Sequence, residues 1–387
     1  MGNNKLSLSV LKVSDERIQA HRNHLNNAIN FRTPKRLPLT YFYCERNEGN
    51  LDHLTPQEVI NRDYIEYSNN PDFMYHRGHY NKVIDEWNNL AEKFPTLDIN
   101  AFYLMKSFQE CMATAFGVPF EIDDEGNLTV DYIDSRVMNT LDDWENPKLN
   151  KHPDYTKDGM FGHMWSYYNF LNDYGDPRIH YRFPIYLGPF LIAGHLLGTE
   201  ASFMGFEEEP EKMKIFMNWL TDECIKMKIT LQKLMGEKKV HGHFQYDRGT
   251  AMLWDDNISM CSDKWYVKHI SHYNERIFKV FGGGGFHTCG PLKPKIYKSL
   301  YAMPSMHCIN FAFVNSDMTL SADDILEMKE LLHGAAMINC PPPNDLDSFT
   351  PEFVKKLMKN GGVSIYDYGD DERCERLMNV LDKSELL

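Results

Sequence analysis

The chain has 387 residues and a formal net charge of −14, with 42% hydrophobic and 25% charged residues. This length accommodates one large α/β barrel or two medium domains, and the composition excludes disordered and fibrous proteins. The acidic balance argues against nucleic acid or an anionic membrane as the main partner, because both require a basic surface.

The N-terminus lacks the apolar run of a signal peptide. The longest apolar stretch, Tyr186–Leu197, is too short to span a bilayer and is interrupted by Gly, Pro and His. We therefore expect a cytoplasmic protein whose eight cysteines are reduced.

The N-terminal third gives the weakest signals. Residues 1–35 indicate a helical lead-in, and Tyr41–Cys44 indicates an inner strand. Residues 47–98 are polar and aromatic without clear periodicity. We interpret them as an insertion that covers the mouth of a barrel.

The middle of the chain has clearer periodicity. Pro184–Gly194 is an apolar, glycine-containing stretch, and Thr250–Trp254 predicts a strand. Pro210–Met235 predicts a long amphipathic helix, and Ser262-Asp263 begins another that runs to about Val280. The apolar residues of the long helix are Ile215, Trp219, Ile225 and Leu231.

The C-terminal part alternates between strands and helices. Strands are predicted at Gly285–Cys289, Cys308–Val314, Ala335–Cys340 and Val363–Tyr368. Helices are predicted at 293–301, after the capping-box residues Ser321–Asp324, after Thr350-Pro351, and at Asp370–Leu386. Such alternation requires a parallel sheet with right-handed crossovers. The spacing leaves room for eight units, which favours a single (β/α)8 TIM barrel over a doubly wound sheet.

Barrel chemistry gathers where strands end, which directs attention to Asp255 and Asp256. Either carboxylate could bind a substrate hydroxyl, a ring nitrogen or a water. Adjacent residues of a strand point to opposite sides, so at most one of the two faces inward. The alternative is that they only form the loop and cap the next helix.

His287 and Cys289 alternate along one strand, so both side chains point to the same face. An imidazole and a thiolate together suit zinc. The third ligand would be Cys374, near the start of the last helix, where the helix dipole would lower the pKa of a thiol, or Cys340, at the end of the neighbouring strand. Alternatively, His287 only forms a hydrogen bond in the rim and Cys289 is a small buried apolar residue.

Four segments together resemble the uroporphyrinogen decarboxylase superfamily, and the resemblance runs from about residue 15 to the end. They are Phe31–Pro38, Phe116–Glu121 with the Asp-Glu-Gly-Asn turn that follows, Leu187–Gly198, and Asp255–Met260 with the later Gly-Gly-Phe-His287-Thr-Cys289-Gly290. The resemblance implies a TIM barrel.

That superfamily contains porphyrinogen decarboxylases and zinc-dependent corrinoid methyltransferases. The decarboxylases carry an arginine-rich segment and an essential aspartate. This chain has one arginine in Cys44–Gly49 and Phe108 at the place of the aspartate. The methyltransferases bind zinc through His-x-Cys and a distant cysteine at the end of the last strand. His287 and Cys289 match this pattern, whereas Gly369-Asp370 stands at that strand end and Cys374 follows.

The resemblance therefore implies a zinc-dependent methyltransferase that moves a methyl group between a small molecule and the corrinoid of a partner protein, since no corrinoid-binding module is recognisable in the chain. Its metal ligands would be His287, Cys289 and either Cys374 or Cys340, and Asp255 or Asp256 would position the substrate. One alternative is a metal-free decarboxylase or lyase acting on a small carboxylated substrate. Another is a binding protein without catalytic activity.

Overall fold

The computed structural model places most of the chain. The residues it describes are 8–43, 73–98, 102–104, 111–122, 128–130, 136–182, 186–235, 251–288, 303–311, 320–332, 334–343 and 345–385. Cys289 and Gly290, the predicted helix at 293–301 and the segment 44–72 lie outside them.

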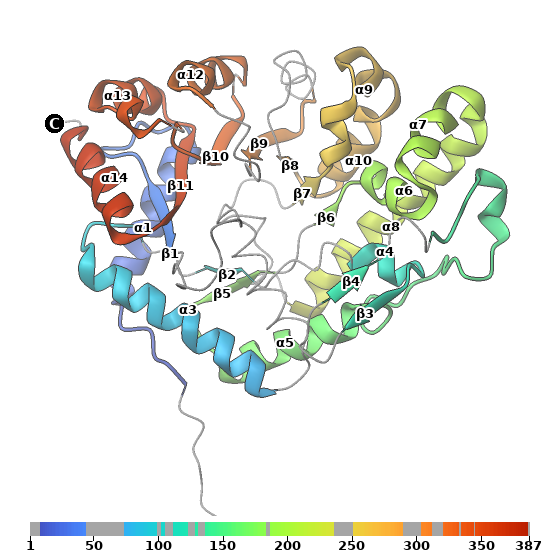
Figure 1. The fold of residues 1–387 in the computed structure, drawn as a ribbon, viewed down its shortest axis with the longest axis horizontal. Helices are drawn as coiled ribbons and strands as arrows, with labels where there is room; N and C mark the ends of the chain where they lie inside the picture. The colour runs from blue at the N-terminus through green and yellow to red at the C-terminus, as the bar shows by residue number, and fades with distance from the viewer. Residues whose placement is uncertain are drawn as a thin grey trace, which may run out of the picture.

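A parallel sheet forms the centre of the fold. Its strands follow one another in the order β1-β11-β10-β9-β8-β7-β6, and every neighbouring pair is parallel. The strands are β1 (Leu39–Tyr43), β6 (Tyr186–Leu187), β7 (Ala251–Trp254), β8 (Gly284–Thr288), β9 (Met306–Phe311), β10 (Ala336–Cys340) and β11 (Val363–Gly369). They form an arc with helices along its outer side (Figure 1). The predicted parallel α/β architecture is confirmed.

Four more strands lie apart from this sheet. β2 (Phe102–Leu104) and β5 (His180–Arg182) form a separate parallel pair. β3 (Phe120–Ile122) and β4 (Leu128–Val130) form an antiparallel hairpin. Within the described residues the hydrogen-bonded sheet thus holds seven strands, where the sequence predicts eight.

Helices occupy most of the remaining described chain. They are α1 (Asp15–Ile29), α3 (Phe73–Lys93), α4 (Cys111–Ala115), α5 (Phe161–Tyr174), α6 (Pro189–Leu197), α7 (Thr199–Glu208), α8 (Pro210–Met235), α9 (Asp263–His269), α10 (Ser271–Val280), α12 (Ala322–Leu331), α13 (Pro351–Met358) and α14 (Asp371–Lys383), with short 3-10 turns η1 (Leu141–Glu145), η2 (Asp256–Met260) and η3 (Leu346–Ser348). In the described part of the chain, no helix combines the length and apolar character needed to cross a membrane.

Side-chain caps begin the helices of the C-terminal half where the sequence predicts them. Ser321 accepts a hydrogen bond from the Asp324 amide, and the Asp324 carboxylate accepts one from the Ser321 amide, which forms the predicted capping box of α12. Thr350 caps α13 in front of Pro351. These local hydrogen bonds explain why the start of both helices can be predicted from the sequence.

Two helical predictions differ from the structure in part. α8 has the predicted bounds, and of its predicted apolar residues Leu231 is buried while Trp219 and Ile225 are partly buried against the core. Ile215, however, is 64% exposed, and residues such as Met213, Phe216 and Leu220 complete the buried face. The helix predicted from Ser262 to Val280 is divided into α9 and α10 at Ile270, whose amide still bonds to the Tyr266 carbonyl. In both cases the apolar pattern of the sequence locates the helical segment but not its buried face or its break.

The predicted insertion at 47–98 contains α3, which belongs to the core. Tyr80, Ile84, Trp87 and Leu90 are buried on one face of this helix. The Tyr80 ring lies edge-on to Phe170 of α5, with 6.4 Å between the ring centroids. The second half of the segment therefore contains a packed helix, where the sequence shows no clear periodicity.

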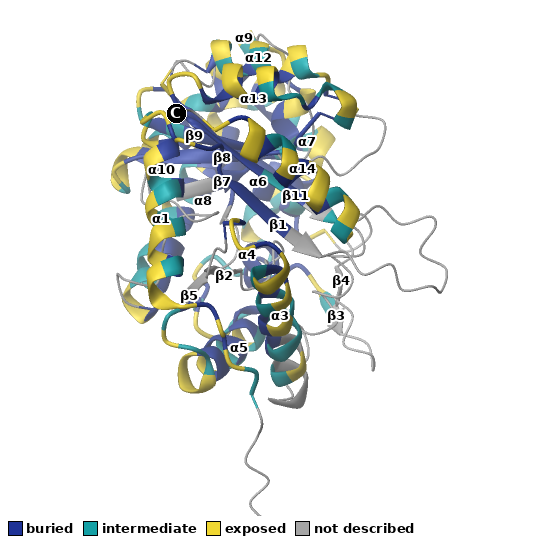
Figure 2. Ribbon diagram, turned by 90° about the vertical axis from the view of Figure 1, so that its left-hand side faces the viewer, coloured by how far each residue is buried: buried dark blue, intermediate teal, exposed yellow. Residues whose placement is uncertain are grey.

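α1 lies at the end of the sheet from which the strands start, as Figure 2 shows. Its residues Leu25 and Ile29 form a separate buried cluster with Cys308 of β9 and with Ala336 and Ile338 of β10. The predicted lead-in is thus a helix that covers this end of the sheet. Cys308 is buried in that cluster against α1.

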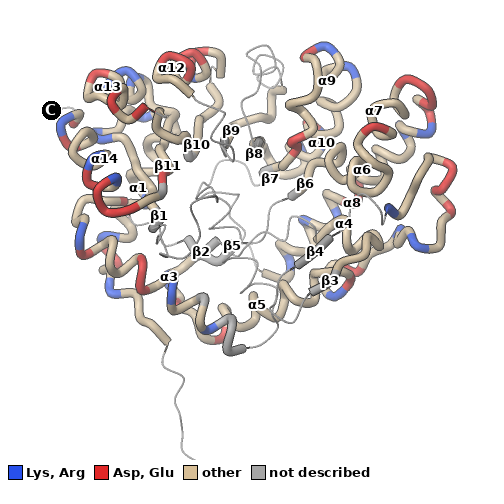
Figure 3. The backbone as a smooth tube through the Cα atoms, viewed as in Figure 1, with Lys and Arg blue, Asp and Glu red and all other residues tan. Residues whose placement is uncertain are grey.

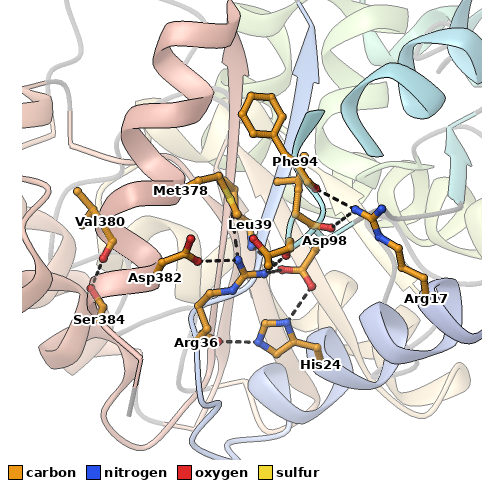
Figure 4. A network of polar contacts seen from close by, with 12 residues as sticks. Arg17, His24, Arg36, Leu39, Phe94, Asp98, Met378, Val380, Asp382 and Ser384 are labelled. Atoms are coloured by element: carbon orange, nitrogen blue, oxygen red, sulfur yellow. Dashed lines mark hydrogen bonds and ion pairs between the residues drawn. The ribbon is translucent and has the colours of Figure 1, made fainter. Parts of the chain in front are cut away.

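A buried charge network joins α1 to the end of the chain (Figure 4). The Asp98 carboxylate accepts hydrogen bonds from His24 (2.8 Å) and from the Leu39 amide (3.2 Å). Arg36 pairs with Asp98 (3.4 Å) and with Asp382 of α14 (3.3 Å). Burial alone would raise the pKa of Asp98, but the hydrogen bond and charge of His24 and the charge of Arg36 hold it below its usual value.

The charge state of His24 follows from its two partners. Nδ1 faces the Asp98 carboxylate, and Nε2 lies 2.6 Å from the Arg36 carbonyl oxygen, so both ring nitrogens must donate. Burial would lower the pKa of His24, but the hydrogen bond and charge of Asp98, together with the bond to the Arg36 carbonyl, outweigh burial and raise the pKa. His24 is therefore an imidazolium that neutralises Asp98.

The remaining charges lie mainly on the helices around the outside, with both signs interspersed (Figure 3). This arrangement is typical of a solvated surface.

Candidate functional site

Four residues stand side by side across the middle of the sheet. In the strand register Trp254 of β7 is opposite His287 of β8, His287 is opposite Asn310 of β9, and Asn310 is opposite Ile338 of β10. Paired residues of parallel strands point to the same face. The sheet therefore presents an indole, an imidazole and an amide in one row.

The row lies on the inner face of the strand arc. Phe286, next to His287, packs edge-on against Phe278 of α10, with 5.2 Å between the ring centroids, so Phe286 points to the helix-covered face. Since side chains alternate along a strand, His287 points to the opposite, inner face. Cys289, which the sequence predicts on the same face as His287, lies outside the described residues.

His287 is 2% exposed and is held by two of these neighbours. The Trp254 ring stacks on the imidazole, with 3.8 Å between centroids and an interplanar angle of 13°. Nδ1 bonds to Oδ1 of Asn310, and Nδ2 of Asn310 donates to the Ile338 carbonyl at 3.0 Å. Burial lowers the pKa of His287 to about 3, although the bond to Asn310 opposes this change. His287 is therefore a neutral imidazole at physiological pH.

Cys340 lies on the other face of the sheet. Phe286 points to the helix-covered face. Residues paired with it across the strands point to the same face, namely Ile309 of β9, Met337 of β10 and Val363 of β11. Ile365 shares the face of Val363, and a register shift pairs Cys340 with Ile365. Cys340 thus points away from the face of His287, and its Sγ lies 3.4 Å from the Pro341 carbonyl oxygen.

Cys374 is also on the helix-covered side. It is fully buried in the first turn of α14, where its electrostatic neighbours include Asp367 and Asp371. Burial, with these carboxylates, raises the pKa of Cys374 to about 12, and burial raises that of Cys340 to about 12 as well. The expected lowering by the helix dipole is therefore wrong, because burial and the acidic neighbours outweigh it. The structure brings neither thiol to His287.

The two aspartates at the end of β7 differ in burial. Asp256 is partly exposed as the first residue of η2, whereas Asp255 is fully buried. Asp255 Oδ2 lies 3.4 Å from Nδ2 of Asn274 in α10, and a Cβ at Gly188 would lie 3.1 Å from the carboxyl group. Asp255 therefore points into the helix layer and not toward the strand ends.

The buried Asp255 carboxyl is weakly hydrogen-bonded. Its Oδ1 has no hydrogen-bond partner among the described residues. Burial raises the pKa of Asp255 to about 8, with a contribution from the charge of Asp256, while the Asn274 bond opposes it. At neutral pH Asp255 is mainly an uncharged acid, which suits a packing position.

Among the described residues, no three His, Cys, Asp or Glu side chains lie close enough together to hold a metal ion. His287 suits one metal position, because it is neutral and its Nδ1 is bonded to an amide oxygen. Cys289, the other ligand expected from the motif, is outside the described residues. Of the expected His-x-Cys ligand pair, the described residues thus contain the histidine, in a form suited to binding a metal.

The sequence alone does not indicate Trp254 and Asn310 as site residues. A usable signal was present for Asn310, a single amide in the otherwise apolar run Cys308-Ile-Asn-Phe-Ala-Phe. A buried polar residue within a central strand requires a partner. Trp254 carries no such signal, because an aromatic residue is common in a strand.

By sequence, the chain matches no family model and no curated protein. By structure, it is similar to a methyltransferase from Methanosarcina mazei, with a TM-score of 0.59 and 12% sequence identity. The alignment covers 94% of this chain and 98% of that chain. At this identity the likeness concerns the fold, and it extends over nearly the whole of both chains.

Proposed function

We propose that this chain is a methyltransferase of the zinc-dependent corrinoid branch of the uroporphyrinogen decarboxylase superfamily. The observation that carries the proposal is His287, a buried neutral imidazole on the inner face of the sheet with Nδ1 bonded to Asn310. The His-x-Cys spacing and the fold shared with a methyltransferase support it. The proposal includes a single domain in which the strand arc closes as a (β/α)8 barrel.

The proposed zinc ligands are His287 through Nε2 and Cys289 through its thiolate. When bound, zinc would act as a Lewis acid that makes a thiol or similar acceptor nucleophilic toward a methyl-cobalt group, or activates a methylated substrate for the reverse transfer. The corrinoid would be carried by a partner protein. Because Cys340 and Cys374 lie on the opposite face of the sheet, the proposal rests on His287 and Cys289 for the metal.

The chain's own residues would prepare this site in two ways. The stacked Trp254 covers one face of the imidazole and excludes water from it. Asp256 is the partly exposed carboxylate at the end of β7, so we assign substrate positioning to it. We assign Asp255 a structural role in the helix layer, because it is buried there.

The test combines metal content with methyl transfer. Protein loaded with zinc and desalted should retain one equivalent per chain by mass spectrometry, and His287→Ala and Cys289→Ala should lose it. Cys374→Ala is the matched control, because it removes a buried thiol from the other face and should retain the metal. Methyl transfer from methylcobalamin to a small thiol, followed by the absorbance of the cobalt centre, should fail in the first two variants.

The result that contradicts the proposal is wild-type protein without stoichiometric zinc, together with an activity that Cys289→Ala does not change. That outcome would favour a metal-free decarboxylase or lyase. Tight ligand binding without turnover, unaffected by His287→Ala, would favour a binding protein.

A further inference from the structure

We infer that Asn310 is a positioning residue that fixes the tautomer and orientation of His287, with Trp254 holding the plane of the ring. The part of this inference that concerns metal binding rests on the proposed function. The part that concerns the tautomer depends only on the described contacts.

The orientation of the Asn310 amide is set by the next strand. Nδ2 of Asn310 donates to the Ile338 carbonyl of β10 at 3.0 Å. A carbonyl oxygen can only accept, so the amide nitrogen must face β10, and Oδ1 must face β8. The Asn310 side chain is 1% exposed, so water cannot substitute for either contact.

This orientation determines which nitrogen of His287 carries the proton. Oδ1 of Asn310 is an acceptor, so the Nδ1 atom that bonds to it must be protonated. A neutral imidazole has one proton, and the lone pair then lies on Nε2. The chain from the Ile338 carbonyl through Asn310 thus selects the Nδ1–H tautomer and makes Nε2 the basic nitrogen.

The stacked indole restrains the remaining freedom of the ring. The 13° interplanar angle and the 3.8 Å centroid distance leave little space for the imidazole to rotate about its Cβ–Cγ bond. Loss of a comparable outer contact of a metal-bound histidine weakens metal binding by about 10–100-fold. We expect an effect in that range when Asn310 loses its acceptor.

The experiment compares three variants. Asn310→Leu keeps the approximate size and removes both hydrogen bonds. Asn310→Asp keeps an acceptor toward Nδ1, so Nδ1 of His287 should remain protonated. Asn274→Leu is the matched control, because Asn274 is also a fully buried amide but contacts Asp255 and Tyr266 instead of His287.

Two readouts separate the inference from the proposed function. Nitrogen-15 NMR of histidine-labelled, metal-free protein distinguishes the two neutral tautomers, and His287→Gln identifies the signal. Wild type, Asn310→Asp and Asn274→Leu should show Nδ1–H, whereas Asn310→Leu should show Nε2–H or a mixture. Zinc affinity, measured by competition with a chelator, should fall about 10–100-fold in Asn310→Leu and stay within about twofold of wild type in Asn274→Leu.

An Nε2–H tautomer in wild type would overturn the inference whatever the zinc affinity. Equal losses of zinc affinity in Asn310→Leu and Asn274→Leu would overturn it as well. If wild type binds no zinc, the proposed function fails, while the tautomer measurement still decides the role of Asn310. If Asn310→Leu does not fold, the tautomers of wild type and Asn310→Asp decide it.

Discussion

Replacing Asp255 by Asn should make the protein progressively more stable than wild type as the pH rises. The pKa of this buried carboxyl is about 8 in the folded chain and near 3.8 when exposed. The folded state therefore retains a proton that the unfolded state releases. Wild type has its full stability below pH 4 and loses part of it as the pH rises toward 8, and the loss arises because unfolding releases the proton.

The size of the effect follows from the two pKa values. Each unit of difference corresponds to about 1.4 kcal/mol, so a difference of about four units gives about 6 kcal/mol above pH 8. Between pH 5 and pH 8, the stability of Asp255→Asn relative to wild type should rise by about 4 kcal/mol. The neutral Asn side chain preserves the size of Asp255 next to Gly188 and Asn274.

Urea denaturation followed by tryptophan fluorescence, at pH 5 and pH 8, measures this difference. Other groups titrate in both proteins and cancel when the variant is compared with wild type. An equal stability difference at the two pH values would refute the reasoning, because it would mean that the Asp255 carboxyl titrates alike in the folded and unfolded chains.

Two more predictions concern buried groups. Asp98→Asn leaves the His24 and Arg36 cations without their shared anion, so it should lower the free energy of unfolding by about 3–5 kcal/mol in urea denaturation at pH 7, and a loss below 1 kcal/mol would contradict the network. The free thiols of Cys340 and Cys374 should not react with Ellman's reagent in the native protein at pH 7.5, since each is buried with its pKa raised to about 12. The native titration of a Cys340→Ala, Cys374→Ala double variant should equal that of wild type, and a difference of one or two thiols would show that these sites open.

The C-terminal half of the fold could be predicted because its signals are local. The caps at Ser321 and Thr350 depend on residues three positions apart, and the structure contains both. The exposed Ile215 could not be predicted, because a long helix has apolar residues on more than one face. Which face is buried depends on helices distant in sequence.

For the site, the sequence predicts only which side chains of one strand share a face, and not how different strands and helices place their residues relative to one another. His287 faces inward, as alternation along its strand requires. The positions of Cys340 and Cys374 depend instead on how strands and helices pack against one another, which the sequence of one strand does not show. A register shift in β10 turns Cys340 to the helix side, and the packing of α14 buries Cys374 there. The place of Asp255 in the chain predicts a side chain at the strand ends, whereas its burial depends on the space beside Gly188 and Asn274.

The pairing of β1 with β11 has a consequence for synthesis on the ribosome. β1 is an end strand of the described sheet, and its partner spans Val363–Gly369, near the C-terminus. The Arg36 side chain beside β1 likewise cannot form its ion pair until Asp382 has been synthesised. A nascent chain thus exposes β1 without this neighbour until β11 has also left the exit tunnel. Until then the unpaired edge of β1 is open to incorrect pairing, so this strand is one that a chaperone would need to protect.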